Sequence, residues 1–257
     1  MLHDFTKDKF DIIIQAGQSN SEGYAFGHVD APYQPDGRVW YLNQDGTVTL
    51  AAEKVAGNGI QSNFAPSFAR EYLNAGRLAE GRKLLIVRSA VGGTGFLDNH
   101  WKLTDDLYLQ MVEMTRTALS LNPENRLVAL LWHQGETDAG CHATYDQHYN
   151  HLMTLVQSVR QTFDAPDLPF VAGDFVHDWR DANAEICAPV LQAIRAVCAD
   201  CGRGGFVETD GLKSNAQEAI DHPLGWGNGD TIHFSRRSIY ELGGRYFATF
   251  TEIADGQ

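Results

Sequence analysis

The chain has 257 residues, of which 43% are hydrophobic and 21% charged, and its formal net charge is −13. This length is enough for one large domain with a full core. The acidity argues against a nucleic-acid partner or an anionic membrane surface, because clustered Lys and Arg bind both. No stretch reaches the roughly 18 apolar residues of a membrane-spanning helix, and no signal peptide is visible. We therefore expect a cytoplasmic protein, and an oligomer is not evident.

Five short runs rich in β-branched or apolar residues predict strands, at residues 11–16, 38–42, 83–89, 126–132 and 169–175. The first, third and fourth runs are almost continuously apolar, which suits strands buried on both faces of a parallel sheet. Stretches with helical spacing lie between or after them, at 65–75, 105–121, 145–162 and 184–197. A last helix is expected from Ser235, a suitable N-cap residue, to about Phe250.

This alternation of strands and helices predicts the fold class. It favours a three-layer α/β/α doubly wound sandwich of the flavodoxin-like type, with a mainly parallel five-stranded sheet. No linker or repeat divides the chain, so we expect a single domain over 1–257, with its core at about 11–250. The stretches 46–62 and 202–228 are expected to be loops. Ligands bind such folds at the carboxyl ends of the strands, so the chemistry is expected there.

Ser19 follows the first predicted strand directly, in the segment Gly17-Gln-Ser-Asn20. A serine at such a turn exposes its hydroxyl, which becomes a nucleophile when an adjacent base takes its proton. The segment differs from the G-x-S-x-G elbow, because Ser21 stands where that motif has glycine. A turn serine that caps the next segment is the alternative interpretation.

Two more polar segments follow predicted strands. The third strand leads into Ser89-Ala-Val-Gly-Gly-Thr-Gly95, whose glycines can bring an N–H close to an oxyanion, although a flexible turn explains them as well. The fourth strand leads into His133-Gln-Gly-Glu136, where the Gln134 amide can donate to the same oxyanion. A polar network that closes the sheet edge, through Glu136 and Asp138, is an equally good explanation of this segment.

Asp230 and His233 lie three residues apart, in a predicted loop just before the last helix. The Asp230 carboxylate can orient the imidazole, which leaves the other ring nitrogen of His233 to deprotonate a serine. His133 is the rival base, but no carboxylate stands at a suitable offset to orient it. These features favour His233 among the ten histidines.

Metal binding is the other use of histidine. His142, His148 and His151 lie before or on the helix predicted at 145–162, but no complete zinc ligand set accompanies them. We interpret them as a solvated helix face and expect no metal and no cofactor. The four cysteines are expected to be reduced and structural, at positions Cys141, Cys187, Cys198 and Cys201.

In this order, the four segments resemble the SGNH (GDSL-like) hydrolase superfamily, in its sialate O-acetylesterase-like branch, which includes carbohydrate esterase family 6. The resemblance extends from about residue 11 to residue 250. It implies a catalytic triad of Ser19, Asp230 and His233. It also implies an oxyanion hole made of the Ser19 amide, the Gly93 amide and the side chain of Gln134, which replaces the superfamily's usual Asn.

Some details of the site are left open by the resemblance. Spacing does not decide whether Gly92 or Gly93 donates its amide, and we favour Gly93. Ser21 stands where the branch usually has Met, which puts a polar residue at the expected pocket floor, and Gly95-Phe96 also departs from the branch pattern. The pocket is expected to include the following residues: Gln18, Asn20, Gly92, Thr94, Glu136 and Trp226.

The resemblance implies a serine esterase, a carboxylic ester hydrolase that removes acetyl groups from sugars. Trp101 and Trp226 can stack on a sugar ring, although packing is the simpler role. An SGNH short-chain esterase, lipase or thioesterase with no sugar preference is the first alternative. A non-catalytic carbohydrate-binding relative is less favoured, because it would be expected to lose at least one triad residue.

Overall fold

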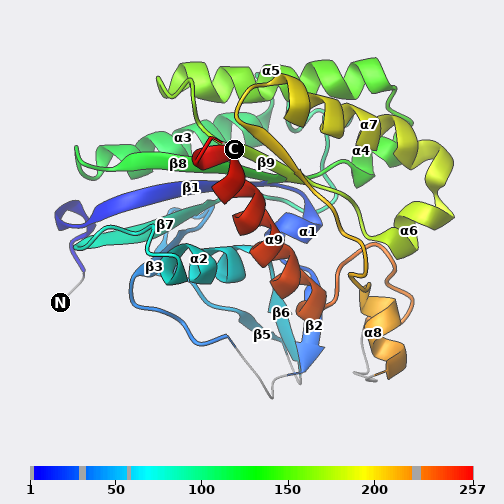
Figure 1. Cartoon of the computed structure of the whole chain (residues 1–257), viewed down its shortest axis with the longest axis horizontal. Helices are drawn as coiled ribbons and strands as arrows, with labels where there is room; N and C mark the ends of the chain where they lie inside the picture. The colour runs from blue at the N-terminus through cyan, green and yellow to red at the C-terminus, as the bar shows by residue number, and fades with distance from the viewer. Residues whose placement is uncertain (1–2, 29–32, 57–58, 222–226, 257) are drawn as a thin grey trace.

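The computed structural model in Figure 1 describes residues 3–28, 33–56, 59–221 and 227–256. Its larger sheet has seven strands: β1 (Lys9–Gly17), β3 (Val39–Leu42), β4 (Val48–Leu50), β7 (Arg82–Arg88), β8 (Arg126–His133), β9 (Phe170–Gly173) and β10 (Gly204–Val207). They lie in the order β10-β9-β8-β1-β7-β3-β4, and all neighbours are parallel except β3 and β4. The predicted mainly parallel α/β fold is therefore confirmed.

The predicted count of five strands was wrong. All five predicted strands occur, but β4 and β10 extend the sheet at its two edges, within stretches that were predicted as loops. Both are short, and β10 begins with two glycines, so neither carries a strong strand pattern. Numbered along the chain, the five predicted strands lie in the order 2-3-1-4-5, which differs from the 2-1-3-4-5 order of flavodoxin.

A second, antiparallel sheet also occupies part of a predicted loop. It consists of β2 (Ala25–His28), β6 (Gly59–Ser62) and β5 (Lys54–Ala56), in that order. The stretch 46–62 therefore contains β4, β5 and β6, so its prediction as irregular structure was wrong. These strands have only three or four residues each, too few for a clear alternation of polar and apolar positions.

Long helices cover both faces of the larger sheet (Figure 1). On one face lie α3 (Asp106–Ser120), α5 (Tyr145–Thr162) and α7 (Ala184–Asp200), and on the other lie α2 (Ala65–Asn74) and α9 (Arg236–Ala254). Side chains of a strand alternate between faces, so Ile14 packs in the cluster with α5 and α7 while Ile13 packs in the cluster with α2 and α9. All five helices were predicted to within a few residues.

Side-chain caps begin two of these five helices, α5 and α9. The Thr144 hydroxyl accepts a hydrogen bond from the Gln147 amide, and the Thr144 amide donates to the Gln147 side-chain oxygen, which completes a capping box at the start of α5. Ser235 accepts from the Ser238 amide and caps α9 as predicted. Four short helices were not predicted: α1 (Ser19–Glu22), α4 (Glu136–Gly140), α6 (His177–Ala182) and α8 (Asn215–Asp221). The last lies in the second stretch predicted as a loop.

Two further features bear on the expectations from sequence. All four cysteines are free thiols. Among the helices in the described part of the chain, none is both long and apolar enough to cross a bilayer.

The close approach of the ends of β1 and β8 sets the position of Ser19. Gly17 lies opposite His133 in the parallel register and has a φ of 122°, and a Cβ there would lie 2.1 Å from the His133 carbonyl oxygen. Only glycine fits so close an approach. The next amide, of Gln18, donates to the same carbonyl at 2.9 Å. The chain therefore turns directly from β1 into α1, whose first residue is Ser19.

Candidate active site

Ser19, His233 and Asp230 form a continuous hydrogen-bonded chain. The Ser19 hydroxyl oxygen lies 2.8 Å from Nε2 of His233, and Nδ1 of His233 lies 2.9 Å and 3.0 Å from the two carboxylate oxygens of Asp230. Residues 214 positions apart in the sequence are thus brought together by the end of β1 and the loop before α9. The arrangement has the geometry of a nucleophile, a base and an orienting acid.

The surroundings of Asp230 keep it ionised. Burial alone would raise the pKa of this carboxyl, but hydrogen bonds from His233 and Asn215 outweigh that effect and hold the pKa below its ordinary value. A carboxylate beside Nδ1 of His233 favours the tautomer that carries its hydrogen on that nitrogen. Nε2 is then left as an acceptor for the Ser19 proton.

Asn215 was missed by the sequence analysis. Its side-chain nitrogen donates to Oδ2 of Asp230 at 2.8 Å and to the Tyr24 carbonyl at 2.8 Å, and its oxygen accepts from the Phe26 amide at 3.0 Å. Asn215 therefore ties the acid of the site to β2. It begins α8 within a stretch predicted as a loop, and no local pattern marks a contact across 191 positions.

Tyr24 was also missed. Its ring stacks on the imidazole of His233, with the centroids 5.1 Å apart and the planes inclined by 23°. The contact restricts the ring of His233 from the side, while Asp230 holds it in the plane. Tyr24 follows the C-cap residue Gly23 of α1, so the short helix that carries Ser19 also positions this aromatic ring.

A cavity of about 330 Å³ opens beside the Ser19 hydroxyl. Among the predicted pocket residues, Gln18, Gly92 and Glu136 contribute to its walls, whereas Asn20 and Thr94 do not. Trp226 lies outside the described residues. The complete lining comprises Gln18, Ser19, Tyr24, Gly92, Gly93, Glu136, Thr137, Ile232 and His233.

Asn20 fastens the loop of His233 instead of lining the cavity. Its side-chain nitrogen donates to Oε1 of Glu136 at 2.8 Å and to the Ile232 carbonyl at 3.0 Å, and its oxygen accepts from the Phe234 amide at 3.1 Å. The residues on both sides of His233 are thus bonded to the residue next to Ser19. This arrangement fixes the distance between nucleophile and base.

Thr94 and Trp101 form a buried pair behind the cavity. The Thr94 hydroxyl donates to the Val91 carbonyl at 2.7 Å and accepts from the Trp101 indole nitrogen at 2.9 Å. Trp101 is fully buried and packs edge-on against Trp132 at 5.0 Å. Packing, the simpler of the two roles considered for Trp101, is the one observed.

The two glycines after β7 differ in the state of their amides. The Gly92 amide donates to Oε2 of Glu22 at 2.6 Å, so it is already engaged within the protein. Gly93 has a φ of 71° and lines the cavity beside Ser19. This difference favours Gly93 as the donor to an oxyanion.

Gln134, the third predicted oxyanion donor, is not among the residues that line the Ser19 cavity. It is buried, and its side-chain nitrogen donates to Oδ2 of Asp138 at 2.9 Å and to the Thr94 carbonyl at 3.3 Å. The side chain would have to turn away from Asp138 to reach the carbonyl of a substrate. The oxyanion role of Gln134 stays a prediction.

Asp138 organises the loop that carries Gly93. Its buried carboxylate accepts from the amides of Phe96 at 3.1 Å and Leu97 at 2.9 Å, and it lies 3.3 Å from Nδ1 of His148. Burial would raise the pKa of Asp138, but the contact with His148 and the backbone hydrogen bonds outweigh that effect and lower it.

The interpretation of His148 as part of a solvated helix face was wrong, because His148 is buried on the inner face of α5. No cluster of three possible metal ligands occurs within the described ranges.

Two further buried groups stand at the end of β8. Burial raises the pKa of Glu136, and the hydrogen bond from Asn20 offsets this only in part. His133 is fully buried, with Nδ1 2.9 Å from the Tyr246 hydroxyl, and burial lowers its pKa to about 3. His133 is absent from the lining of the Ser19 cavity, so the geometry favours His233 as the base.

Comparison with known proteins gives consistent results. Residues 9–252 match the family described as carbohydrate esterase, sialic acid-specific acetylesterase. A probable 9-O-acetyl-N-acetylneuraminic acid deacetylase of Escherichia coli (strain K12) is 26% identical over 226 residues, which cover 68% of this chain and 69% of that protein. A probable carbohydrate esterase of Arabidopsis thaliana is 26% identical over 141 residues, covering 52% of this chain and 50% of the relative.

Solved structures show the same fold. The crystal structure of NanS superposes with a TM-score of 0.81 at 19% identity, over 98% of this chain and 99% of that one. A carbohydrate acetylesterase from Xanthomonas citri superposes with a TM-score of 0.63 at 17% identity, over 96% of this chain and 57% of that one. A GDSL-like lipase from Parabacteroides merdae, described as putative, gives 0.56 at 11% identity, over 95% and 97% of the two chains.

Proposed function

Because this chain belongs to the carbohydrate esterase family of sialic acid-specific acetylesterases, and is thereby a carbohydrate O-acetylesterase, we propose that it forms an acyl-enzyme on Ser19. The observation that carries this proposal is the unbroken chain from the Ser19 hydroxyl through His233 to Asp230, with each link between 2.8 Å and 3.0 Å. This series of hydrogen bonds ends at the Ser19 hydroxyl, which lies in the wall of a cavity, so an ester can reach its oxygen.

The geometry supports a two-step hydrolysis. Nε2 of His233 takes the proton of Ser19 as the serine oxygen attacks the ester carbonyl, and Asp230 stabilises the resulting imidazolium. The amides of Ser19 and Gly93, with Gln134 as the third predicted donor, stabilise the negative oxygen of the tetrahedral intermediate. His233 then protonates the leaving sugar oxygen, which leaves the acyl group on Ser19. A water molecule that His233 deprotonates attacks this acyl-enzyme and releases acetate.

The cavity supports a small acyl group attached to a sugar. Its volume of about 330 Å³ lies at the low end of small-molecule sites, which span roughly 300–1,000 Å³. Gln18, Glu136 and Thr137 offer polar contacts, and Tyr24 adds an aromatic wall. The name of the Escherichia coli relative makes an O-acetylated sialic acid the first substrate to test. Cytoplasmic location and the absence of nucleic-acid or membrane partners stay predictions.

Covalent labelling tests the nucleophile. We expect an organophosphonate to add one equivalent to the wild-type protein, measured by intact mass, and none to a folded Ser19→Ala variant. Ser120→Ala is the matched control, because Ser120 is exposed on α3 and should leave labelling unchanged. Stoichiometric labelling of Ser19→Ala would exclude Ser19 as the nucleophile.

A substrate panel tests the preference for acetylated sugars. We expect O-acetylated monosaccharides to be hydrolysed, and the rate on p-nitrophenyl esters to fall as the acyl chain lengthens, because the cavity is small. Equal rates on long acyl chains, with no activity on sugars, would instead favour a general short-chain esterase. Hydrolysis of p-nitrophenyl acetate that disappears in His233→Ala would exclude a purely binding role.

A further inference from the structure

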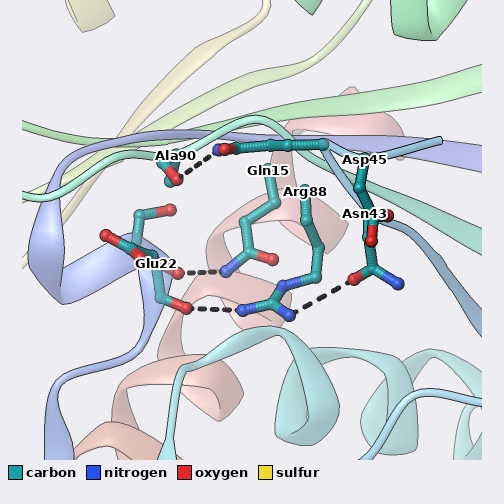
Figure 2. A pocket seen from close by; sticks show the side chains of 8 residues that line it. Gln15, Glu22, Asn43, Asp45, Arg88 and Ala90 are labelled. Atoms are coloured by element: carbon teal, nitrogen blue, oxygen red, sulfur yellow. Dashed lines mark hydrogen bonds between the residues drawn. The ribbon is translucent and has the colours of Figure 1, made fainter. Parts of the chain in front are cut away.

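A second cavity, of about 290 Å³, lies beside the active site at the carboxyl ends of β1, β7 and β3 (Figure 2). Seven of its eight lining residues are polar or charged, and Ala90 is the exception. Its size lies just below the range of about 300–1,000 Å³ that is usual for small-molecule sites. None of the proposed triad residues lines it, so it is distinct from the cavity at Ser19.

Two buried polar atoms in this cavity wall have no partner. The side-chain nitrogen of Gln15 donates to the Ser21 carbonyl and to Oδ1 of Asn63, but its oxygen Oε1 accepts no hydrogen bond from the described residues. In Figure 2 this oxygen faces the side chain of Arg88. The Ser21 hydroxyl, fully buried, is likewise without a partner in the described part of the chain. Buried polar atoms are normally hydrogen-bonded, so both point to an occupant.

The charges in the wall exclude an anion as the preferred occupant. Arg88 contributes one guanidinium, which already donates to the Glu22 carbonyl at 2.8 Å and lies 4.7 Å above the ring of Tyr41. Glu22 and Asp45 also line this cavity, and the Glu22 carboxylate accepts from the Gly92 amide. A hydrogen bond from Thr47 holds the pKa of Asp45 below its ordinary value, so this group is ionised at neutral pH. The charges of Arg88 and Asp45 therefore balance, and an anion would meet no net positive charge in this wall.

The chemistry of the wall suits hydroxyl groups, which donate and accept at the same atom. Gln15 Oε1 and the Asp45 carboxylate can accept hydrogen bonds from a ligand, and the Ser21 hydroxyl can donate one or accept one. We propose that the cavity between Gln15, Ser21 and Arg88 binds a neutral, hydroxyl-rich molecule of the size of a monosaccharide.

Such a ligand would contact the helix that carries the nucleophile. Ser21 lies two residues after Ser19 in α1, and the Glu22 carboxylate accepts from the Gly92 amide in the wall of the Ser19 cavity. The sugar has two possible sources: a second unit of the substrate, or a separate effector. Both require the same contacts in the cavity.

Amide NMR on the full chain tests binding, with D-mannose, D-galactose and N-acetyl-D-glucosamine as probes and sulfate as the anionic probe. We expect saturable shifts at Gln15, Ser21 and Arg88 with at least one sugar and not with sulfate. Protein whose Ser19 carries an organophosphonate should give the same shifts, because that adduct fills only the first cavity. If Ser19 fails to label, the proposed function fails while the sugar titration still reports on the second cavity.

Substitutions at Ser21 and Asp45 locate the site. Ser21→Met fills the cavity and should weaken sugar binding at least tenfold, while Ser21→Ala keeps the space and should weaken it less. Asp45→Asn, at the exposed rim, should weaken binding even if Ser21→Met does not fold. Ser120→Ala should change nothing. Unchanged affinity in folded Ser21→Met and in Asp45→Asn would overturn the proposal, as would sulfate binding in place of sugar, or no saturable shift with any sugar.

Kinetics separate the two sources of the sugar. If the occupant is a second substrate unit, Ser21→Met should raise the KM for an acetylated disaccharide more than the KM for an acetylated monosaccharide. If it is an effector, free sugar should change the wild-type rate without competing with substrate, and this change should be lost in Ser21→Met. If neither kinetic effect appears, and if the two variants bind sugar as the wild type does, the proposal is overturned.

Discussion

Two aspartate–histidine pairs lie at the carboxyl edge of the same sheet. In one pair, Nδ1 of His233 is 2.9 Å from Asp230, and the two side chains are 18% and 21% exposed. In the other, Nδ1 of His148 is 3.3 Å from Asp138, and both side chains are 0% exposed. The residue types are the same, but Nδ1 of His233 forms hydrogen bonds with Asp230, whereas Nδ1 of His148 has no hydrogen-bond partner among the described residues.

The second ring nitrogen separates their roles. Nε2 of His233 faces the Ser19 hydroxyl at a cavity, as a general base must. Nε2 of His148 is buried and has no hydrogen-bond partner among the described residues. Its aspartate, Asp138, instead holds the loop of Gly93 through two backbone amides. Access to a reactive hydroxyl therefore distinguishes the proposed base from a histidine that supports the fold.

The sharpest test of this comparison is His233→Ala. We expect kcat for p-nitrophenyl acetate to fall roughly 10⁵–10⁶-fold, because Ser19 loses its base. The urea midpoint of unfolding should change little, since the side chain is partly exposed. A variant that keeps more than a tenth of the activity would contradict the role of His233.

Asp230→Asn tests the orienting carboxylate. The amide of Asn can donate to Nδ1 of His233 and so favour the tautomer that carries its hydrogen on Nε2, which cannot accept the Ser19 proton. We expect kcat to fall about 10⁴-fold, by analogy with the same change in other triads. Asp167→Asn, on an exposed carboxylate just before β9, is the control for p-nitrophenyl acetate turnover. Equal activity of the two variants would show that Asp230 does not set the tautomer.

His148→Ala should give the opposite pattern from His233→Ala. It leaves the Asp138 carboxylate buried without its imidazole, which costs about 3–5 kcal/mol of unfolding free energy by the usual effect of breaking a buried pair. We expect kcat in the remaining folded protein to fall less than tenfold. Urea unfolding and active-site titration with the phosphonate separate the two quantities. A large loss of kcat at unchanged stability would break the comparison between the pairs.

Gln134→Ala tests whether Gln134, which is bonded to Asp138 of the buried pair, also stabilises the oxyanion. One oxyanion donor is worth roughly 10²–10³ in kcat, so a loss of that size with little change in KM would place the Gln134 amide at the oxyanion. The structure instead bonds this amide to Asp138. A loss below tenfold would show that Gln134 only supports the loop. Gln192→Ala, on α7 away from the Ser19 cavity, is the matched control.

The sequence indicated the first pair and part of the second, because a polar network through Asp138 was one of the interpretations while His148 was placed on a solvated helix face. Asp230 and His233 are close in the sequence and directly precede a capped helix, so a local pattern was enough to single them out. His148 also carried a usable signal, because it stands at i, i+4 and i+7 spacing with Leu152 and Leu155, which are buried on α5. Histidine can be part of an apolar helix face, and this spacing places His148 on the buried face of α5.

Other misses had no local signal. Asn215 acts through contacts with Tyr24 and with Phe26 of β2. These two residues lie soon after the first strand but 191 and 189 positions before Asn215 in the chain. The edge strand β10 is only four residues long, and two of these are glycines. Such features depend on which distant segments pack together, and the spacing of residues in one sequence does not record that.

A third histidine, His133, extends the comparison because it is fully buried, and its Nε2 lies 3.9 Å from Oε1 of Glu136 without a hydrogen-bond partner among the described residues. Burial lowers its pKa to about 3, whereas the unfolded chain should have a pKa of about 6.5. Below pH 6.5 the unfolded state therefore binds a proton that the folded state does not, and His133 costs about 1.4 kcal/mol of stability per pH unit down to about pH 3. Above pH 6.5 neither state binds this proton, so the penalty from His133 disappears. We expect urea unfolding of the wild type between pH 7 and pH 5 to show a steeper loss than that of His133→Gln, which cannot titrate. Equal slopes would mean that His133 takes up a proton in the folded protein, and burial alone would then not explain why it differs from His233.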